Sequence, residues 1–113
     1  MELIDEMKNY LDLCEQSIKS LKRTGHARAE TERDYKVLLR QECLKLRDSG
    51  TAIGMIELTC YGIPSVAEAR FNRDVADTNY TANLEAINFY KLKCRLLDNQ
   101  INREYGMAGK GNF

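Results

Sequence analysis

The residues best suited to bind a ligand lie in a basic segment between positions 19 and 47. This segment holds nine Lys and Arg residues against four Asp and Glu residues, and it contains the single histidine of the sequence. Guanidinium groups bind phosphate through paired hydrogen bonds, and a histidine or tyrosine ring offers a surface on which a base can stack. The segment predicts a site for an anionic ligand, with Arg23, His26 and Arg28 as its basic members. The alternatives are a solvated charged face or a contact with acidic helix turns of another subunit.

Sequence signatures of catalysis and of metal binding are missing. The sequence contains no G-x-S-x-G, H-E-x-x-H, Walker or calcium-loop pattern. The cysteines at positions 14, 43, 60 and 94 form no C-x-x-C pair, so we expect small buried apolar residues rather than zinc ligands. We therefore expect a protein that is not an enzyme and that uses no metal or cofactor.

Composition and length indicate a single domain that stays outside the membrane. The 113 residues include 17 basic and 17 acidic side chains, and this balance argues against a wholly basic nucleic-acid binder. No stretch approaches the roughly 18 apolar residues that a membrane span needs. The first fifteen residues carry five acids and one lysine, unlike a secretory signal, so we expect a cytoplasmic location.

A long helix is predicted for residues 1–48. Seven-residue spacing persists across Gly25, which favours one continuous helix over two helices joined by a loop, with a possible bend at this glycine. The apolar stripe of the first half recurs every three or four residues and consists of Leu3, Met7, Tyr10, Cys14, Ile18 and Leu21.

A short helix over 51–61 and a second long helix over 65–105 complete the predicted elements. Gly50 can end the first helix, Thr51 can cap the short one, and Ser65 with Glu68 forms a capping box for the last. The tail 106–113 holds three glycines and is expected to fray. The apolar corner residues either plug one end of the core, which we favour, or form an exposed patch: Ile53, Met55, Ile56, Leu58, Tyr61 and Ile63. The stripe predicted to face the first helix is Phe71, Val75, Thr78, Ala82, Phe89, Leu92, Leu96 and Ile101.

The predicted lengths require an all-α, elongated antiparallel helical hairpin with a short corner helix. A helix over 66–105 extends about 60 Å, whereas a compact domain of this size has a radius of gyration of about 13 Å. Further apolar residues lie off the stripes and would face water in a lone hairpin. They predict a homodimer or tetramer that forms an oligomeric helical bundle, and they are Ile4, Leu11, Leu39, Leu46, Leu84 and Ile87.

Folding the hairpin about its corner places residue i opposite roughly residue 114 − i. Gly25 then lies near Phe89. The small residues around Gly25 leave space between the helices, and either Phe89 and Tyr90 fill this space or a cavity remains there. The same register brings three side chains across from the basic segment. They complete the predicted ligand site and are Asn83, Tyr90 and Lys91.

Several stretches of the chain, rich in residues typical of helix surfaces, carry a resemblance to known proteins. They are DYKVLLRQE (34–42), YG (61–62), VAEARF (66–71), AIN (86–88) and KLKCRLLDNQINREYG (91–106). In these stretches the chain resembles a group of small helical proteins that are encoded in early-gene regions of phages and prophages of Gram-positive bacteria. The resemblance implies no active-site residues. It implies a protein that acts by binding host defence components, nucleotide immune signals, or replication and recombination factors.

The basic segment and the resemblance together lead us to expect a non-enzymatic phage protein in the host cytosol. It would bind and sequester a nucleotide-type host immune signal, as a counter-defence sponge. The alternative is a protein–protein interaction module that inhibits a host defence protein or assists phage replication or recombination. Binding of single-stranded nucleic acid ranks below both, because the net charge is zero.

Overall fold

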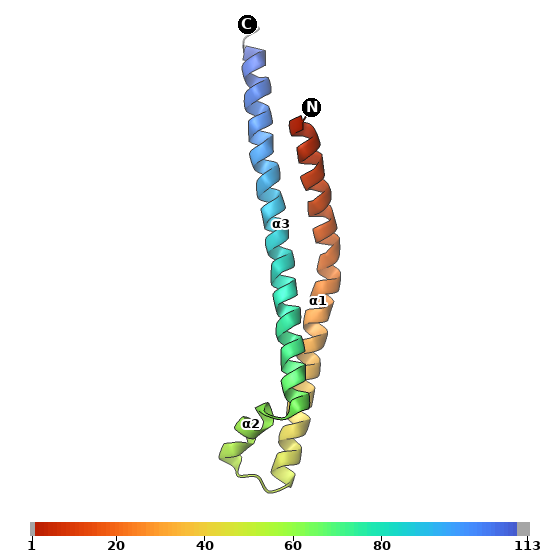
Figure 1. Cartoon of the computed structure of the whole chain (residues 1–113), viewed down its shortest axis with the longest axis vertical. Helices are drawn as coiled ribbons and strands as arrows, with labels where there is room; N and C mark the ends of the chain where they lie inside the picture. Colours follow the sequence, from red (N-terminus) through yellow and green to blue (C-terminus); the bar gives the residue numbers. More distant parts are fainter. Residues whose placement is uncertain (1, 111–113) are drawn as a thin grey trace. The chain divides into compact units, whose positions relative to one another are not determined.

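A computed structural model describes residues 2–110 of the chain, with side chains through residue 106. Over this range the protein is all-helical, with α1 at Glu2–Asp48, α2 at Ile53–Tyr61 and α3 at Pro64–Lys110 (Figure 1). As the heptad register predicts, α1 includes Gly25. The predicted tail begins at Gly106, but α3 continues as far as Lys110. Residues 111–113 lie outside the described part of the chain.

Charge and backbone geometry account for the ends of α1. Acidic residues occupy its first turn and basic residues its last, so both complement the helix dipole. At its C-terminus Gly50 has φ +89°, a left-handed conformation that glycine adopts at little cost. The N–H groups of Gly50 and Thr51 donate to the carbonyls of Arg47 and Leu46 at 3.1 and 3.0 Å, which completes a Schellman motif.

The two predicted N-caps are wrong. The N-cap of α2 is Ala52 rather than Thr51, and no side chain caps this helix. At the start of α3 the carbonyl of Ile63 accepts a 2.9 Å hydrogen bond from the N–H of Ala67, so Pro64 takes the first helical position. Proline suits this position because its missing N–H has no intrahelical acceptor there.

The chain divides into two compact units. Unit 1 contains α1 up to Lys22 and α3 from Thr81 onward, and unit 2 contains Arg23–Tyr80. In unit 1 the two helix segments pack antiparallel, because the Asn83 amide donates to the Ser17 carbonyl at 2.7 Å while Tyr90 packs against Tyr10 further towards the N-terminus of α1. The buried side chains of this unit are Cys14, Ile87 and Leu97.

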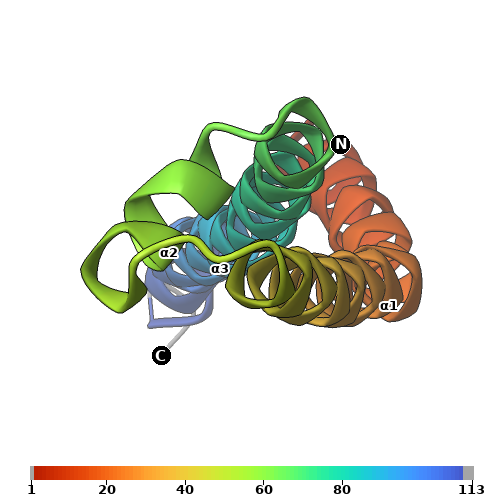
Figure 2. The same ribbon diagram turned by 90° about the horizontal axis from the view of Figure 1, so that it is seen from below.

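The core of unit 2 is built by all three helices. Tyr35 of α1, Cys60 of α2 and Val66 of α3 are buried together. In Figure 2, α2 lies beside the C-terminal turns of α1 and the first turns of α3. The partly buried residues around this core are Leu38, Leu39, Cys43, Leu46, Ile63 and Ala69.

The expectation that α2 plugs the core is wrong for three of its apolar residues. Cys60 is buried and Ile63 packs on the core, but Ile53 is 87% exposed. Met55 and Leu58 are also exposed. The outer face of α2 is therefore an exposed apolar patch, which was the alternative interpretation.

The predicted register between the long helices is wrong by more than two turns. Gly25 lies against Tyr80 rather than Phe89, which is nine residues further along α3. The cause is the position of α2. The Cys60 thiol donates to the Leu39 carbonyl at 3.7 Å, so α2 packs against the last turns of α1 and α3 begins beside earlier turns.

The predicted inner stripe of α3 is also wrong. Among the described residues of α3, the buried ones are Val66 and Ala76 in unit 2 and Ile87 and Leu97 in unit 1. Ile101 is half-buried, but the other seven predicted residues are exposed, with Phe71 at 62%. We call these seven the α3 stripe: Phe71, Val75, Thr78, Ala82, Phe89, Leu92 and Leu96.

Four other apolar residues differ in burial from what the stripes predicted. Ile87 is buried and Leu39 and Leu46 are half-buried, although they were expected to face water. Ile18 is exposed, although it was expected to face inward. Ile4, Leu11 and Leu84 are exposed, as predicted for a single chain.

Candidate functional site

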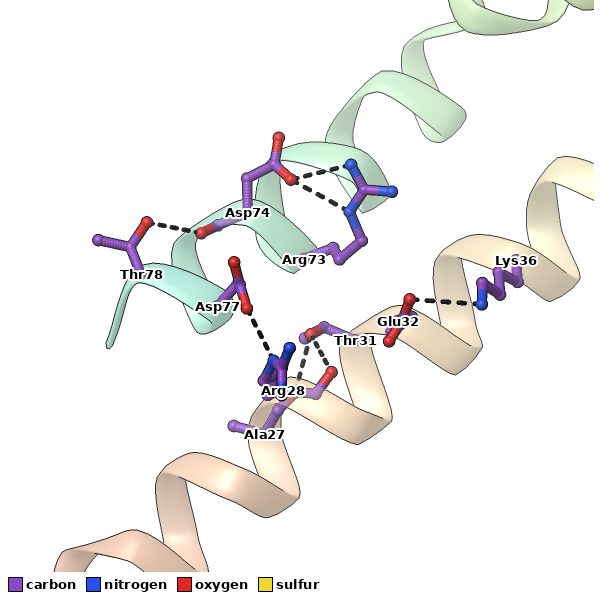
Figure 3. Close-up of polar contacts among 9 residues, drawn as sticks. All are labelled: Ala27, Arg28, Thr31, Glu32, Lys36, Arg73, Asp74, Asp77 and Thr78. Carbon is purple, nitrogen blue, oxygen red and sulfur yellow. Dashed lines mark hydrogen bonds and ion pairs between the residues drawn. The ribbon is translucent and has the colours of Figure 1, made fainter. Parts of the chain in front are cut away.

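The basic members of the predicted ligand site lie on α1 within unit 2, and two of them, Arg28 and Arg23, line separate concavities between α1 and α3. The first concavity is a groove of about 240 Å³, which we call the charged groove. Figure 3 shows the polar side chains of this region converging from both helices. The residues that line the groove are Arg28, Glu32, Arg73, Asp74 and Asp77.

Arg28 is held in the charged groove by two contacts with α3. Its Nε donates to Asp77 Oδ1 at 2.7 Å (Figure 3), and its guanidinium carbon lies 5.1 Å from the centre of the Tyr80 ring. The Tyr80 ring in turn lies against Gly25, where no side chain competes for the space. Arg28 therefore already has an anionic partner and an aromatic partner within the chain.

Arg73 is partnered in the same way. Its Nε and Nη2 donate to Asp74 Oδ1 at 3.1 and 2.9 Å, and its guanidinium carbon lies 4.5 Å from the centre of the Tyr35 ring. The hydrogen bond with Asp74 is the main reason why the pKa of Arg73 is raised. The groove thus holds three carboxylates and two guanidinium groups, and an incoming anion would have to displace a carboxylate from an arginine.

The second concavity, which we call the apolar hollow, has a volume of about 340 Å³ and no carboxylate in its lining. Ala27 and Val75 provide apolar surface, and Ala76 beside them is buried. The Thr31 hydroxyl lies 2.8 Å from the Ala27 carbonyl and is bonded within its own helix. The full lining is Arg23, Thr24, Ala27, Thr31, Phe71, Asn72, Val75, Ala76 and Asn79.

Arg23 is the one predicted site residue that lines the apolar hollow. Among the residues that the structure describes, no carboxylate pairs with Arg23. Asn72 and Asn79 add amide groups that can donate and accept, and Phe71 adds an exposed aromatic ring. This combination suits a small flat ligand that carries a negative group and several hydrogen-bonding atoms.

The expectation that Phe89 and Tyr90 fill the space at Gly25 is wrong, because the Tyr80 ring lies against this glycine. The apolar hollow remains beside Ala27 and Thr31. Tyr80, Asn72 and Asn79 were not among the predicted site residues, although the two asparagines stand one heptad apart and therefore share a helix face.

The six predicted site residues are divided between the two units. In unit 2, His26 is exposed, and its Nδ1 lies 3.3 Å from a Glu30 carboxylate oxygen. Asn83 and Tyr90 belong to unit 1, where the Asn83 amide donates to the Ser17 carbonyl and the Tyr90 ring packs against Tyr10. Lys91, also in unit 1, is exposed. The wrong register is the reason why these three residues were assigned to the site.

The four cysteines are free thiols, and they associate in two pairs that the sequence spacing did not indicate. In unit 2 burial and, to a smaller extent, a hydrogen bond with Cys43 together raise the pKa of Cys60 to about 11. In unit 1 burial and the neighbouring Cys14 raise the pKa of Cys94. A raised pKa keeps a thiol protonated and poorly nucleophilic, so Cys60 and Cys94 are unsuited to nucleophilic chemistry near neutral pH.

Over the part of the chain that the structure describes, no three or more His, Cys, Asp or Glu residues are grouped so that they could hold a metal ion. Within the same residues, every helix is too short or too polar to span a lipid bilayer. In comparisons with known proteins, no family model, curated protein or solved structure matches this chain.

Proposed function

We propose that this protein is a non-catalytic binding module that associates with other helices through the α3 stripe. One observation carries the proposal: seven residues of α3, five of them large and apolar, are exposed and recur at the three- and four-residue spacing of a heptad seam. A seam of this kind is buried in coiled coils and helical bundles. Exposed apolar surface of this extent is typical of protein–protein contact sites.

The proposal corresponds to the interaction module that the sequence left as an alternative. It includes the expected assembly of helical hairpins into an oligomeric bundle, because a second helix pair would cover the α3 stripe. The charged groove gives less support to anion sequestration around Arg28, since the Asp77 carboxylate already occupies that guanidinium. Inhibition of a host defence protein or support of phage replication would both use such a helix-binding surface.

The test compares two leucine-to-lysine variants on the same helix. Leu92 belongs to the α3 stripe and is 45% exposed, whereas Leu84 lies off it and is 37% exposed. Leu92→Lys should abolish association, either with the protein itself or with a partner captured from cells, and Leu84→Lys should preserve it. Circular dichroism should show equal helix content in both variants. If wild type and Leu92→Lys associate equally, the proposal is wrong.

A second candidate function is binding of a nucleotide-type ligand in the apolar hollow. The observation that favours it is that Arg23, which pairs with no carboxylate within the described part of the chain, lies beside Asn72 and Asn79 in a lining without carboxylates. Calorimetry with a panel of cyclic nucleotides should then give a Kd below about 10 µM, or roughly −7 kcal/mol. Arg23→Gln should weaken binding at least tenfold, while Arg28→Gln in the charged groove should leave it unchanged. Absence of binding across the panel removes this candidate.

A further inference from the structure

The α3 stripe has the pattern of one side of a two-helix seam. Val75, Ala82, Phe89 and Leu96 recur every seven residues. Phe71, Thr78 and Leu92 follow the second seven-residue series, in which Glu85 is the remaining member. These two series correspond to the a and d positions of a coiled coil. Because they lie on one helix, Pro64–Lys110, a single partner helix is enough to cover them.

We propose that the partner is a second copy of this chain, whose α3 packs antiparallel on the α3 stripe about a two-fold axis near Ala82–Glu85. The proposal deepens the helix-binding function proposed above and rests on it. In this register Phe71 faces Leu96 of the second copy and Val75 faces its Leu92. Thr78 then faces Phe89, so a small side chain meets a large one, and Ala82 faces Glu85. Every large apolar residue of the stripe thereby gains a partner residue, and two-fold symmetry forms each contact twice.

Charge complementarity selects this register. Asp74 and Arg95 occupy flanking g positions, where antiparallel helices place g opposite g. Both are exposed. In the proposed dimer Asp74 of each copy lies beside Arg95 of the other. The remaining flanking pairs are Thr81 with Asn88, Asn72 with Lys93 and Asn79 with Ala86, none of which brings like charges together.

Other arrangements of two α3 helices do not bring Asp74 of one copy beside Arg95 of the other. A shift by one heptad places Arg95 beside Thr81, and a parallel arrangement places Asp74 beside Asn79. Glu85 is the one charged residue within the seam. Opposite the small Ala82 its carboxylate has room to reach water, and a single polar residue in a seam fixes register at a cost in stability.

The dimer also explains why the apolar hollow lies where it does. Phe71 and Val75 line the hollow and belong to the stripe. Leu96 and Leu92 of the second copy would pack on these two residues and close the hollow from outside. The second copy thus completes the walls of a concavity that one chain leaves open.

Charge reversal tests the pairing, with mass measured by light scattering and sedimentation at a series of concentrations. Wild type should have twice the mass of one chain. Asp74→Arg and Arg95→Asp should each weaken dimerisation at least tenfold, because each homodimer then contains two like-charge pairs. An equimolar mixture of these two variants should dimerise as well as wild type, because both cross-copy pairs are then complementary. Asp98→Arg, on a part of α3 away from the seam, is the control and should leave the wild-type mass unchanged.

Two results would overturn the inference: wild type with the mass of one chain at every concentration, or a mixture of the two variants that stays monomeric while Asp98→Arg dimerises. Circular dichroism of each variant shows whether the helices are intact. The proposed function fails separately, since a monomeric protein that captures a different helical partner, and loses it on Leu92→Lys, retains that function and refutes only the self-pairing. A parallel dimer would also refute the inference, because the mixture would then gain nothing.

Discussion

A methyl group at Gly25 would lie 3.5 Å from Cε2 of Tyr80, at ordinary van der Waals distance. The helix is continuous at this position, so alanine would meet no steric obstacle and would lose less backbone entropy on folding. We predict that Gly25→Ala raises the free energy of unfolding by about 1 kcal/mol. Thermal unfolding checks this prediction. The control is Ala29→Gly, at an exposed position one turn later, which should lower the free energy of unfolding by a similar amount. A lower free energy of unfolding for Gly25→Ala would show that Tyr80 lies too close to Gly25 to admit a methyl group.

Val66 offers a test of the core of unit 2. Its side chain is fully buried with Tyr35 and Cys60. Val66→Ala should cost about 2 kcal/mol, because it removes two methyl groups and leaves a cavity in a packed core. Val37→Ala serves as the matched control and should change stability by less than about 0.5 kcal/mol, since Val37 is 52% exposed. Urea unfolding of the two variants distinguishes them, and equal effects would argue against the observed core.

The ion pair between Arg28 and Asp77 should contribute little to stability. Both side chains are about half exposed, at 49% and 54%, so water screens the attraction. A double-mutant cycle with Arg28→Ala and Asp77→Ala should give a coupling of about 0.5 kcal/mol, with a smaller value in 1 M salt. A salt-independent coupling several times larger would show that the pair is shielded from solvent.

Stability should decline at alkaline pH because of Cys60. The pKa of its thiol is about 11 in the folded protein against 9.0 for an unperturbed thiol. The unfolded chain therefore releases this proton first, so the contribution of the neutral thiol is complete below pH 9 and is lost as the pH rises towards 11. We expect the free energy of unfolding of wild type to fall more steeply over this interval than that of Cys60→Ala. Parallel pH profiles of the two proteins would contradict the raised pKa.

The two long helices could be predicted from the sequence because their signals are local. Heptad spacing carries the first helix through Gly25, and Gly50 marks its end. The starts of the short helix and of the second long helix were harder to predict, because Thr51 and Ser65 are favourable N-cap residues that the chain does not use as caps. The backbone geometry around Ile63 and Pro64 starts α3 without them.

The arrangement of the helices could not be predicted, because two properties of α3 are not local. This helix has an apolar stripe of large residues and a second face on which Tyr80, Asn83 and Tyr90 alternate with Ile87. Tyrosine can pack its ring between helices while its hydroxyl group stays near water. The Asn83 side chain can also lie between the helices, because its amide donates a hydrogen bond to a carbonyl of α1. Counting apolar residues therefore selects the wrong face. The register between α1 and α3 was predicted wrongly because no sequence signal indicates that α2 packs beside α1.

The candidate site was predicted in part. Arg23 lines the apolar hollow and Arg28 lies in the charged groove, whereas the three residues assigned from α3 followed from the wrong register. Asp77, which neutralises Arg28, is a solvent-facing acid in the sequence pattern. Only its distance from Arg28 identifies it as a partner.

The hydrogen bond from Asn83 to the Ser17 carbonyl makes sliding of α3 along α1 costly within unit 1. One heptad before Asn83 the chain has Ala76, and one heptad after it has Tyr90, neither of which carries an amide. Displacement by seven residues in either direction would keep the apolar spacing but would move the Asn83 amide away from the Ser17 carbonyl. The observed alignment of the two segments is therefore held by a polar contact as well as by apolar packing.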